Sequence, residues 1–155
     1  MDKSLDTGNM LANNPTAHFS YTILDTIEAG LVLTGAEVKS VRAGRVSLKE
    51  SFAKLKNGEF WLANAHISPY QNSPAKGYNP TRPRKLLLSK KEIDHLIGKF
   101  KEQGLSLVPL NIHLKHSRIK VELGLGRGKK KYDKRATIKE REAKRIQQRA
   151  VRQKK

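Results

Sequence analysis

Residues 51–63 read Ser-Phe-Ala-Lys-Leu-Lys-Asn-Gly-Glu-Phe-Trp-Leu-Ala, and this stretch decides the fold class. Its first six residues alternate between the two faces that a half-buried strand presents. Asn57-Gly58 is a favoured pair for a two-residue hairpin turn, because both central positions of that turn need a positive φ. The last five residues then predict the returning strand. The sequence therefore predicts an antiparallel hairpin near the middle of the chain.

The sequence on both sides of the hairpin carries further strand and helix signals. Extended segments are predicted at residues 19–24, 30–34, 84–88, 105–116 and 118–123. Two capping boxes, Thr34 to Glu37 and Ser89 to Glu92, each predict the start of a short helix. About six strands and two helices follow one another without the rhythm of a parallel sheet. A mainly β fold, closed as a small antiparallel barrel or a strongly curled sheet, is the economical arrangement.

The chain divides into three segments by composition. Residues 1–17 are polar and predict a flexible N-terminal arm, and residues 18–125 form the predicted β domain. Residues 126–155 hold 14 of the 32 basic residues but only 3 of the 14 acidic ones. This basic C-terminal tail begins with a predicted joint at 126–128. It is rich in helix formers but has few large apolar residues, so we expect it to be disordered when free and helical against a polyanion.

Composition excludes several classes of function. The chain has no cysteine, which excludes disulfides, thiolate zinc sites and thiol catalysis. No apolar run is long enough to span a bilayer, and the first residues lack the pattern of a signal peptide. We therefore expect a cytoplasmic protein with no membrane partner. The five histidines show no metal-ligand spacing, and no nucleophile motif is present, so we expect no metal, no cofactor and no enzymatic activity.

The excess of positive charge indicates an RNA-binding protein. The formal net charge is +18, and a chain this basic is expected to meet a polyanion. Arg82, Arg84 and Lys85 form a basic cluster where the long loop at residues 68–83 enters a strand. Tyrosines near the basic clusters favour RNA or single-stranded nucleic acid, because cations hold phosphates while rings stack on bases.

Four motifs resemble the SsrA-binding protein family, also known as small protein B. They lie at residues 28–44, 66–70, 80–88 and 128–135, in the order and spacing of that family. The resemblance runs from about Asn14 to the end of the chain. It implies an oligonucleotide-binding-type barrel that binds the tRNA-like domain of transfer-messenger RNA. Members of the family deliver this RNA to stalled ribosomes for trans-translation, which rescues the ribosome and tags the nascent chain.

The resemblance also implies partners and site residues. Asn14, Glu28 and Leu87 match positions tied to transfer-messenger RNA binding. Neighbouring charged residues were added to this RNA-binding set on physical grounds: Glu37, Lys39, Arg42, Arg82, Arg84 and Lys85. Elongation factor Tu is implied as an indirect partner through the charged RNA. The sequence shows no sign of dimerisation, so a monomer is expected.

By the same resemblance, the tail enters the decoding centre and the empty messenger channel of the small subunit. Its predicted contacts with ribosomal RNA are Gly128, Lys129, Lys130, Lys131, Tyr132, Asp133, Lys134, Arg135, Arg141, Lys144 and Arg145. Tyr132 stands where the family often has histidine, and its ring keeps the capacity to stack.

Some alternatives remain open at this point. The family usually carries a basic run before its first strand, whereas this chain reads Asn-Pro-Thr-Ala-His-Phe at residues 14–19. Contact between RNA and this arm is therefore in question. Glu37 is equally explained as the capping partner of Thr34, and Leu87 as a core residue. From physics alone, the chain could also be a basic ribosomal-type protein that scaffolds ribosomal RNA.

Overall fold

The structure, a computed structural model, describes residues 9–70, 76–101 and 105–153. In these residues the chain forms nine strands and four helices, compared with about six and two predicted. In chain order they are β1 (Met10–Asn13), α1 (Pro15–Ser20), β2 (Tyr21–Leu31), α2 (Gly35–Arg42), β3 (Val46–Ser47), β4 (Phe52–Lys56), β5 (Glu59–Ala63), β6 (His66–Ile67), β7 (Arg84–Leu87), α3 (Lys90–Phe100), β8 (Leu105–Lys115), β9 (Arg118–Gly128) and α4 (Lys131–Gln153).

Six strands close into an antiparallel barrel. Their order is β8-β4-β5-β7-β2-β9, and β9 pairs again with β8 to complete the ring. The closure between β4 and β8 rests on one paired position, Ala53 with Leu107. β1 adds to β8 outside the ring, and β3 and β6 form a separate two-stranded sheet. The predicted mainly β fold, a small antiparallel barrel, is therefore confirmed.

The central hairpin forms as predicted. Lys56 pairs with Glu59, and the register continues to Phe52 and Ala63. Asn57 and Gly58 have φ values of 53° and 74°, as a two-residue turn between twisted strands requires. The local sequence is therefore sufficient to define this hairpin.

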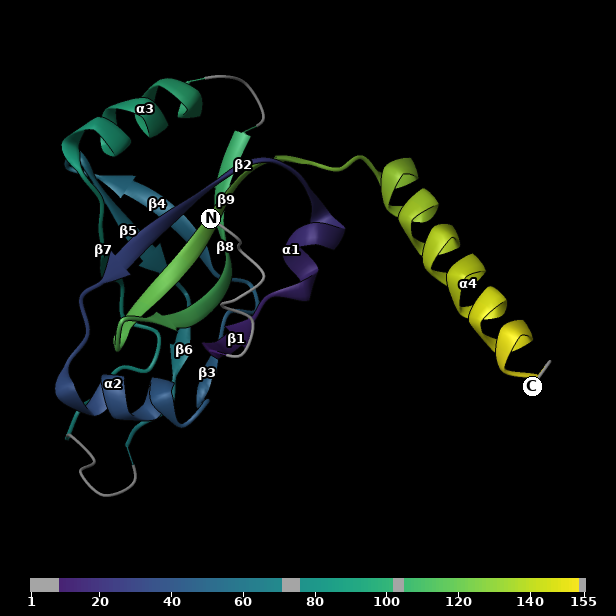
Figure 1. Cartoon of the computed structure of the whole chain (residues 1–155). Helices are drawn as coiled ribbons and strands as arrows, with labels where there is room; N and C mark the ends of the chain where they lie inside the picture. Colours follow the sequence, from purple (N-terminus) through teal and green to yellow (C-terminus); the bar gives the residue numbers. More distant parts are fainter. Residues whose placement is uncertain (1–8, 71–75, 102–104, 154–155) are drawn as a thin grey trace.

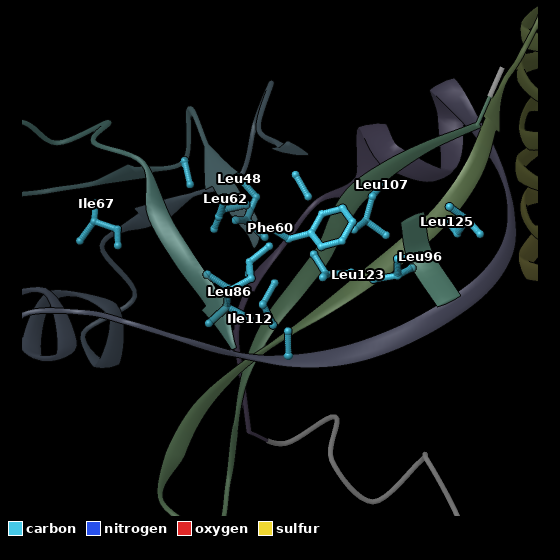
Figure 2. Packing of buried hydrophobic residues seen from close by; sticks show 14 of the residues in the cluster. Leu48, Phe60, Leu62, Ile67, Leu86, Leu96, Leu107, Ile112, Leu123 and Leu125 are labelled. Atoms are coloured by element: carbon cyan, nitrogen blue, oxygen red, sulfur yellow. The ribbon is translucent and has the colours of Figure 1, made fainter. Parts of the chain in front are cut away.

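The barrel interior is filled by aliphatic side chains around Phe60 (Figure 2). Phe60, Leu62, Ile112 and Leu123 are each fully buried. They come from three parts of the chain, so the core holds the hairpin of residues 52–63 to the two long strands β8 and β9.

Two capped helices lie at opposite ends of the barrel (Figure 1). Both predicted capping boxes are present, at Thr34 for α2 and at Ser89 for α3. Gly44 follows α2 with a φ of 77°, which is the left-handed stop that glycine favours. The α2 end of the barrel carries a buried ion-pair network.

Part of the predicted flexible arm instead belongs to the folded body. Met10–Asn13 pair with β8, and Pro15–Ser20 form α1. Ala17 is buried against Val108 and Leu110 on the outer face of the barrel. Pro15 stands in the first turn of α1, where proline is favoured. The remaining arm residues, 1–8, lie outside the described part of the chain.

Two predicted boundaries also differ from the structure. The separate extended runs at 19–24 and 30–34 are replaced by one long strand, β2, and Phe19 is helical. The predicted joint at 126–128 is strand, because β9 continues to Gly128 and pairs there with Tyr21. Small residues at Gly124 and Gly126 let Ile23 lie close to the strand. The folded body therefore extends beyond residue 125, to Gly128.

The tail forms the helix α4 at residues 131–153. In Figure 1 it runs away from the barrel. Helix is the conformation predicted for the tail on a polyanion, while its disorder when free stays a prediction. Arg141 of α4 contacts the body: its guanidinium carbon lies 5.7 Å from the centre of the Phe19 ring in α1.

Candidate nucleic-acid interface

Glu28 lies on the outer face of the barrel, in contact with His113 and Lys115. Strand alternation sends its neighbour Ala29 into the core and Glu28 outward. Its Oε1 lies 2.8 Å from Nε2 of His113, and its Oε2 lies 3.0 Å from Nζ of Lys115. One third of the Glu28 side chain remains exposed. The carboxylate is thus held by the protein and still open to a ligand.

The partners of Glu28 stabilise its ionised form. Burial acts to raise the pKa of Glu28, but the hydrogen bonds and charges of His113 and Lys115 outweigh it and hold that pKa below its usual value. Glu28 is therefore an anion at neutral pH. On a surface that meets RNA, a carboxylate can accept hydrogen bonds from base N–H groups but repels phosphates.

Residues that sequence reasoning missed complete this cluster. Asn111, His113 and Lys115 alternate along β8, so they share one face. Nδ1 of His113 lies 2.8 Å from Oδ1 of Asn111. The alternation at 111, 113 and 115 was visible in the sequence, but the barrel register that brings β8 next to Glu28 was not. We call Glu28, Asn111, His113 and Lys115 the outer-face cluster.

Leu87 extends this surface with an exposed apolar group. It pairs with Gly30, two residues beyond Glu28 on the same face of β2. The Leu87 side chain lies over Gly30, where an added Cβ would be 3.1 Å from the Cβ of Leu87. Leu87 is 51% exposed, whereas its neighbour Leu86 is buried in the core. The structure therefore places Leu87 at the surface, which removes the core interpretation.

Lys85 lies on the same strand, two residues before Leu87. Its ammonium is 3.1 Å from Oε1 of Glu59, and both side chains are about two-fifths exposed. Such a pair contributes little to stability. Lys85 is therefore accessible at the surface, and its contact with RNA stays a prediction.

Glu37 lies in the first turn of α2 and belongs to a buried network. Its side chain is only 1% exposed. Oε1 accepts a hydrogen bond from the backbone N–H of Thr34, which completes the capping box. Arg82 also forms an ion pair with Oε1, and Nε of Arg84 lies 2.8 Å from Oε2.

Arg84 is the most deeply buried charged residue in the described part of the chain. Its side chain is 0% exposed. Besides Glu37, it donates to the carbonyl oxygens of Ala65 and Pro80 and to the hydroxyl of Tyr78, at 2.7–3.0 Å. The guanidinium thus joins α2 to the segment before β7. We call Glu37, Tyr78, Arg82 and Arg84 the buried network.

The charges of this network are matched. Burial alone acts to raise the pKa of Glu37, but hydrogen bonds from Arg82, Thr34 and Arg84 lower it to about 2. Burial and the adjacent Glu37 carboxylate raise the pKa of Tyr78. Glu37 therefore remains ionised through its neighbours, and each polar group that it presents is already occupied by the protein.

Three residues predicted to contact RNA do not reach the surface. Glu37 and Arg84 are buried in the network. Asn14 is also buried: its amide nitrogen donates to the Pro109 carbonyl oxygen at 2.8 Å, and its Oδ1 accepts from Thr16. Each of these three uses its polar atoms to join distant segments of the protein, and their part in RNA binding stays a prediction. Arg82 is one third exposed but is paired with Glu37.

Lys39 and Arg42 lie on the exposed face of α2. The Lys39 ammonium is 5.2 Å from the centre of the Tyr70 ring. Arg42 donates to the carbonyl oxygen of Ser117 in the β8–β9 turn, at 2.9 Å. Both side chains remain exposed. They form a basic surface on α2, which Arg42 joins to the β8–β9 turn.

The predicted tail residues fall into three groups. Gly128 ends β9, and the backbone N–H of Lys129 donates to the carbonyl oxygen of Ser20 at 2.8 Å. The exposed residues are Lys130, Arg135, Arg141, Lys144 and Arg145. The side chains of Lys131, Tyr132, Asp133 and Lys134 lie outside the described residues.

Among the described side chains, no group of three or more His, Cys, Asp or Glu residues could hold a metal ion. Among the described helices, none is long and apolar enough to cross a membrane.

Comparison with known proteins gives consistent matches over nearly the whole chain. A family model described as SmpB protein matches residues 11–153. An SsrA-binding protein from Thermosynechococcus vestitus is 52% identical over 149 residues, which covers 96% of this chain and 98% of that protein. Another from Geobacillus kaustophilus is 54% identical over 146 residues and covers 94% of each chain.

A solved structure agrees with the sequence matches. It is described as "tmRNA-SmpB: a journey to the center of the bacterial ribosome". Its matching chain superposes with a TM-score of 0.64 at 48% sequence identity, and the match covers 77% of this chain and 84% of that one. The likeness therefore covers sequence as well as fold.

Proposed function

The chain belongs to the SmpB protein family, and we propose that it binds the tRNA-like domain of transfer-messenger RNA through its barrel and the ribosome through its tail. Its function is to deliver this RNA to stalled ribosomes for trans-translation. The observation that carries this conclusion is the continuous similarity to SsrA-binding proteins across barrel and tail. A ribosomal scaffold protein, the alternative from charge alone, is not favoured by these matches.

The role proposed for the barrel centres on its outer face. Glu28, Leu87 and Lys85 together present a hydrogen-bond acceptor, an apolar contact and a cation. Bases offer N–H donors and apolar faces, while the backbone offers phosphates. This combination supports recognition of a folded RNA, whereas positive charge alone supports only binding that is independent of sequence.

The role proposed for the tail follows from its charge and its exposure. Arg135, Arg141, Lys144 and Arg145 are exposed along α4, and a helix of this length can follow a channel lined by ribosomal RNA. We place the protein in the cytoplasm as a monomeric RNA-binding adaptor without catalytic activity. Contact with elongation factor Tu is indirect, through the charged RNA.

The division between barrel and tail can be tested with a truncation after Lys130. This end point keeps β9 whole, whereas truncation after residue 125 would remove paired strand residues. We expect the truncated protein to bind the tRNA-like domain selectively against ordinary tRNA, measured by fluorescence anisotropy at one near-physiological salt concentration. Salt must be held constant because basic proteins bind any RNA at low salt.

A second variant in this experiment alters the tail and leaves the barrel unchanged. The double variant Lys134→Glu/Arg135→Glu should bind the tRNA-like domain within about threefold of the wild type, since a rim charge changes affinity little. It should fail to support tagging on stalled ribosomes in a reconstituted translation reaction. If the truncated protein binds all RNAs equally weakly, recognition by the barrel is contradicted.

A further inference from the structure

Both ring nitrogens of His113 face oxygen atoms. Nε2 lies 2.8 Å from Oε1 of Glu28, and Nδ1 lies 2.8 Å from Oδ1 of Asn111. A carboxylate oxygen accepts hydrogen bonds and cannot donate them, so Nε2 must carry the proton that joins His113 to Glu28. This donor is required whichever way the Asn111 amide is turned, because the amide meets only the other nitrogen.

The His113 ring is held more firmly than the other partner of Glu28. Its side chain is 10% exposed, whereas that of Lys115 is 38% exposed. Lys115 ends a flexible stem, and its ammonium can follow a carboxylate into several orientations. His113 has a short stem and a planar ring, and it sits in a strand that pairs with β1 on one side and β9 on the other. The direction of the Glu28 carboxylate therefore depends mainly on His113.

A fixed orientation matters for an acceptor that meets RNA. A carboxylate has about four acceptor positions, and His113 and Lys115 occupy one on each oxygen. Other positions remain unfilled by these two partners, and one third of the Glu28 side chain is exposed. An unheld glutamate would lose rotamer freedom on binding and could turn away from the base donors.

From this geometry we propose that His113 is a positioning residue of the RNA-binding surface. Its Nε2–H fixes the Glu28 carboxylate in the orientation that accepts hydrogen bonds from the RNA bases, and Asn111 holds the ring in place. His113 itself does not contact the RNA. The inference rests on the proposed role of Glu28 in binding the tRNA-like domain.

A matched pair of substitutions separates positioning from packing. In His113→Gln the terminal amide nitrogen reaches the place of Nε2 and can still donate to Glu28. In His113→Asn the amide reaches only the place of Nδ1, so the donor to Glu28 is lost while a polar side chain is kept. His116→Asn serves as the control, because His116 is exposed in the turn of the same hairpin and has a positive φ that asparagine tolerates.

The measurement is the affinity of the full-length variants for the tRNA-like domain, with ordinary tRNA as competitor at constant salt. We expect His113→Asn to weaken binding about tenfold, as loss of a charge-assisted hydrogen bond does. His113→Gln should stay within about threefold of the wild type, and His116→Asn should be unchanged. Thermal unfolding of each variant reports whether the barrel remains folded.

A double-mutant cycle with Glu28→Ala then tests whether His113 acts through Glu28. If it does, the variant Glu28→Ala/His113→Asn binds no more weakly than Glu28→Ala alone. Independent losses that multiply to about a hundredfold would overturn the inference, as would full affinity in His113→Asn. If Glu28→Ala itself binds normally, the premise fails: the proposed role of Glu28 is then wrong, and the inference falls with it.

Discussion

Glu28 and Glu37 lie in the same short motif, yet the fold uses them in opposite ways. Each carboxylate is bound by two basic side chains on distant strands or loops. Glu37 is 1% exposed and has all its partners inside the protein, whereas Glu28 is 33% exposed. The buried network is closed and holds α2 to the barrel. The outer-face cluster leaves part of the Glu28 side chain exposed, so it can accept a ligand.

This comparison shows that an ion pair by itself does not identify a binding residue. A buried charge costs free energy unless its partners are complete, so removal of one member of such a network leaves a buried charge uncompensated. An exposed ion pair costs little free energy to form and contributes little to stability. The two clusters should therefore respond to substitution in different ways, one in stability and the other in binding.

The largest expected effect is on the stability of the buried network. Arg84→Met should lower the free energy of unfolding by about 3–5 kcal/mol, because it removes a buried ion-pair partner from Glu37 and the donors to two carbonyl groups. Urea denaturation followed by circular dichroism measures this loss. The equivalent change in the outer-face cluster, Lys115→Met, should cost less than about 1 kcal/mol. Similar losses in the two variants would remove the distinction between the clusters.

The second effect is a loss of folding stability at low pH. The pKa of Glu37 is about 2 in the folded protein and about 4.5 when unfolded. Its contribution is therefore complete above pH 4.5 and is lost as the pH falls through about 2. That contribution amounts to roughly 3 kcal/mol.

The measurement compares the wild type with Glu37→Gln in urea titrations between pH 7 and pH 2. The wild type should be more stable by roughly 3 kcal/mol at pH 7, and this difference should narrow steadily below pH 4.5. Thr34 and both arginines stay in place in the variant, so the comparison isolates the ionised carboxylate. A difference that does not change with pH would contradict the assigned pKa.

The smallest effect on stability is expected at Leu87, with its neighbour Leu86 as the buried comparison. Leu87→Ala should change stability by less than about 0.5 kcal/mol, because surface substitutions rarely do more, but it should weaken RNA binding severalfold. Leu86→Ala removes a buried side chain and should cost about 2–5 kcal/mol. Thermal unfolding and the anisotropy assay together separate these outcomes. Normal RNA binding by Leu87→Ala would exclude Leu87 from the interface.

Elements with local causes were predictable from the sequence. The turn at Asn57-Gly58 and the capping boxes at Thr34 and Ser89 are confirmed because each depends on residues within a few positions. The N-terminal segment was not predictable in this way. Ala17 is buried through contact with Val108 and Leu110, and no local pattern shows that α1 packs on β8.

The candidate site was predictable only in part. Glu28 and Leu87 entered the prediction through resemblance, and the structure places both on the exposed outer face. Charged residues are rarely fully buried unless they are paired. The sequence shows no pairing of Arg84 with Glu37, so both looked like surface residues. Their pairing across 47 residues depends on the fold and not on sequence spacing.

By itself, the sequence determined the fold class, the basic tail and the family, since these depend on composition, local patterns and motifs. Tertiary structure alone decided which charges face outward. His113 meets Glu28 across 85 residues because the register of β2, β9 and β8 places them on one face of a closed barrel. Strand register depends on the packing of the whole core, which contacts from every part of the barrel determine together.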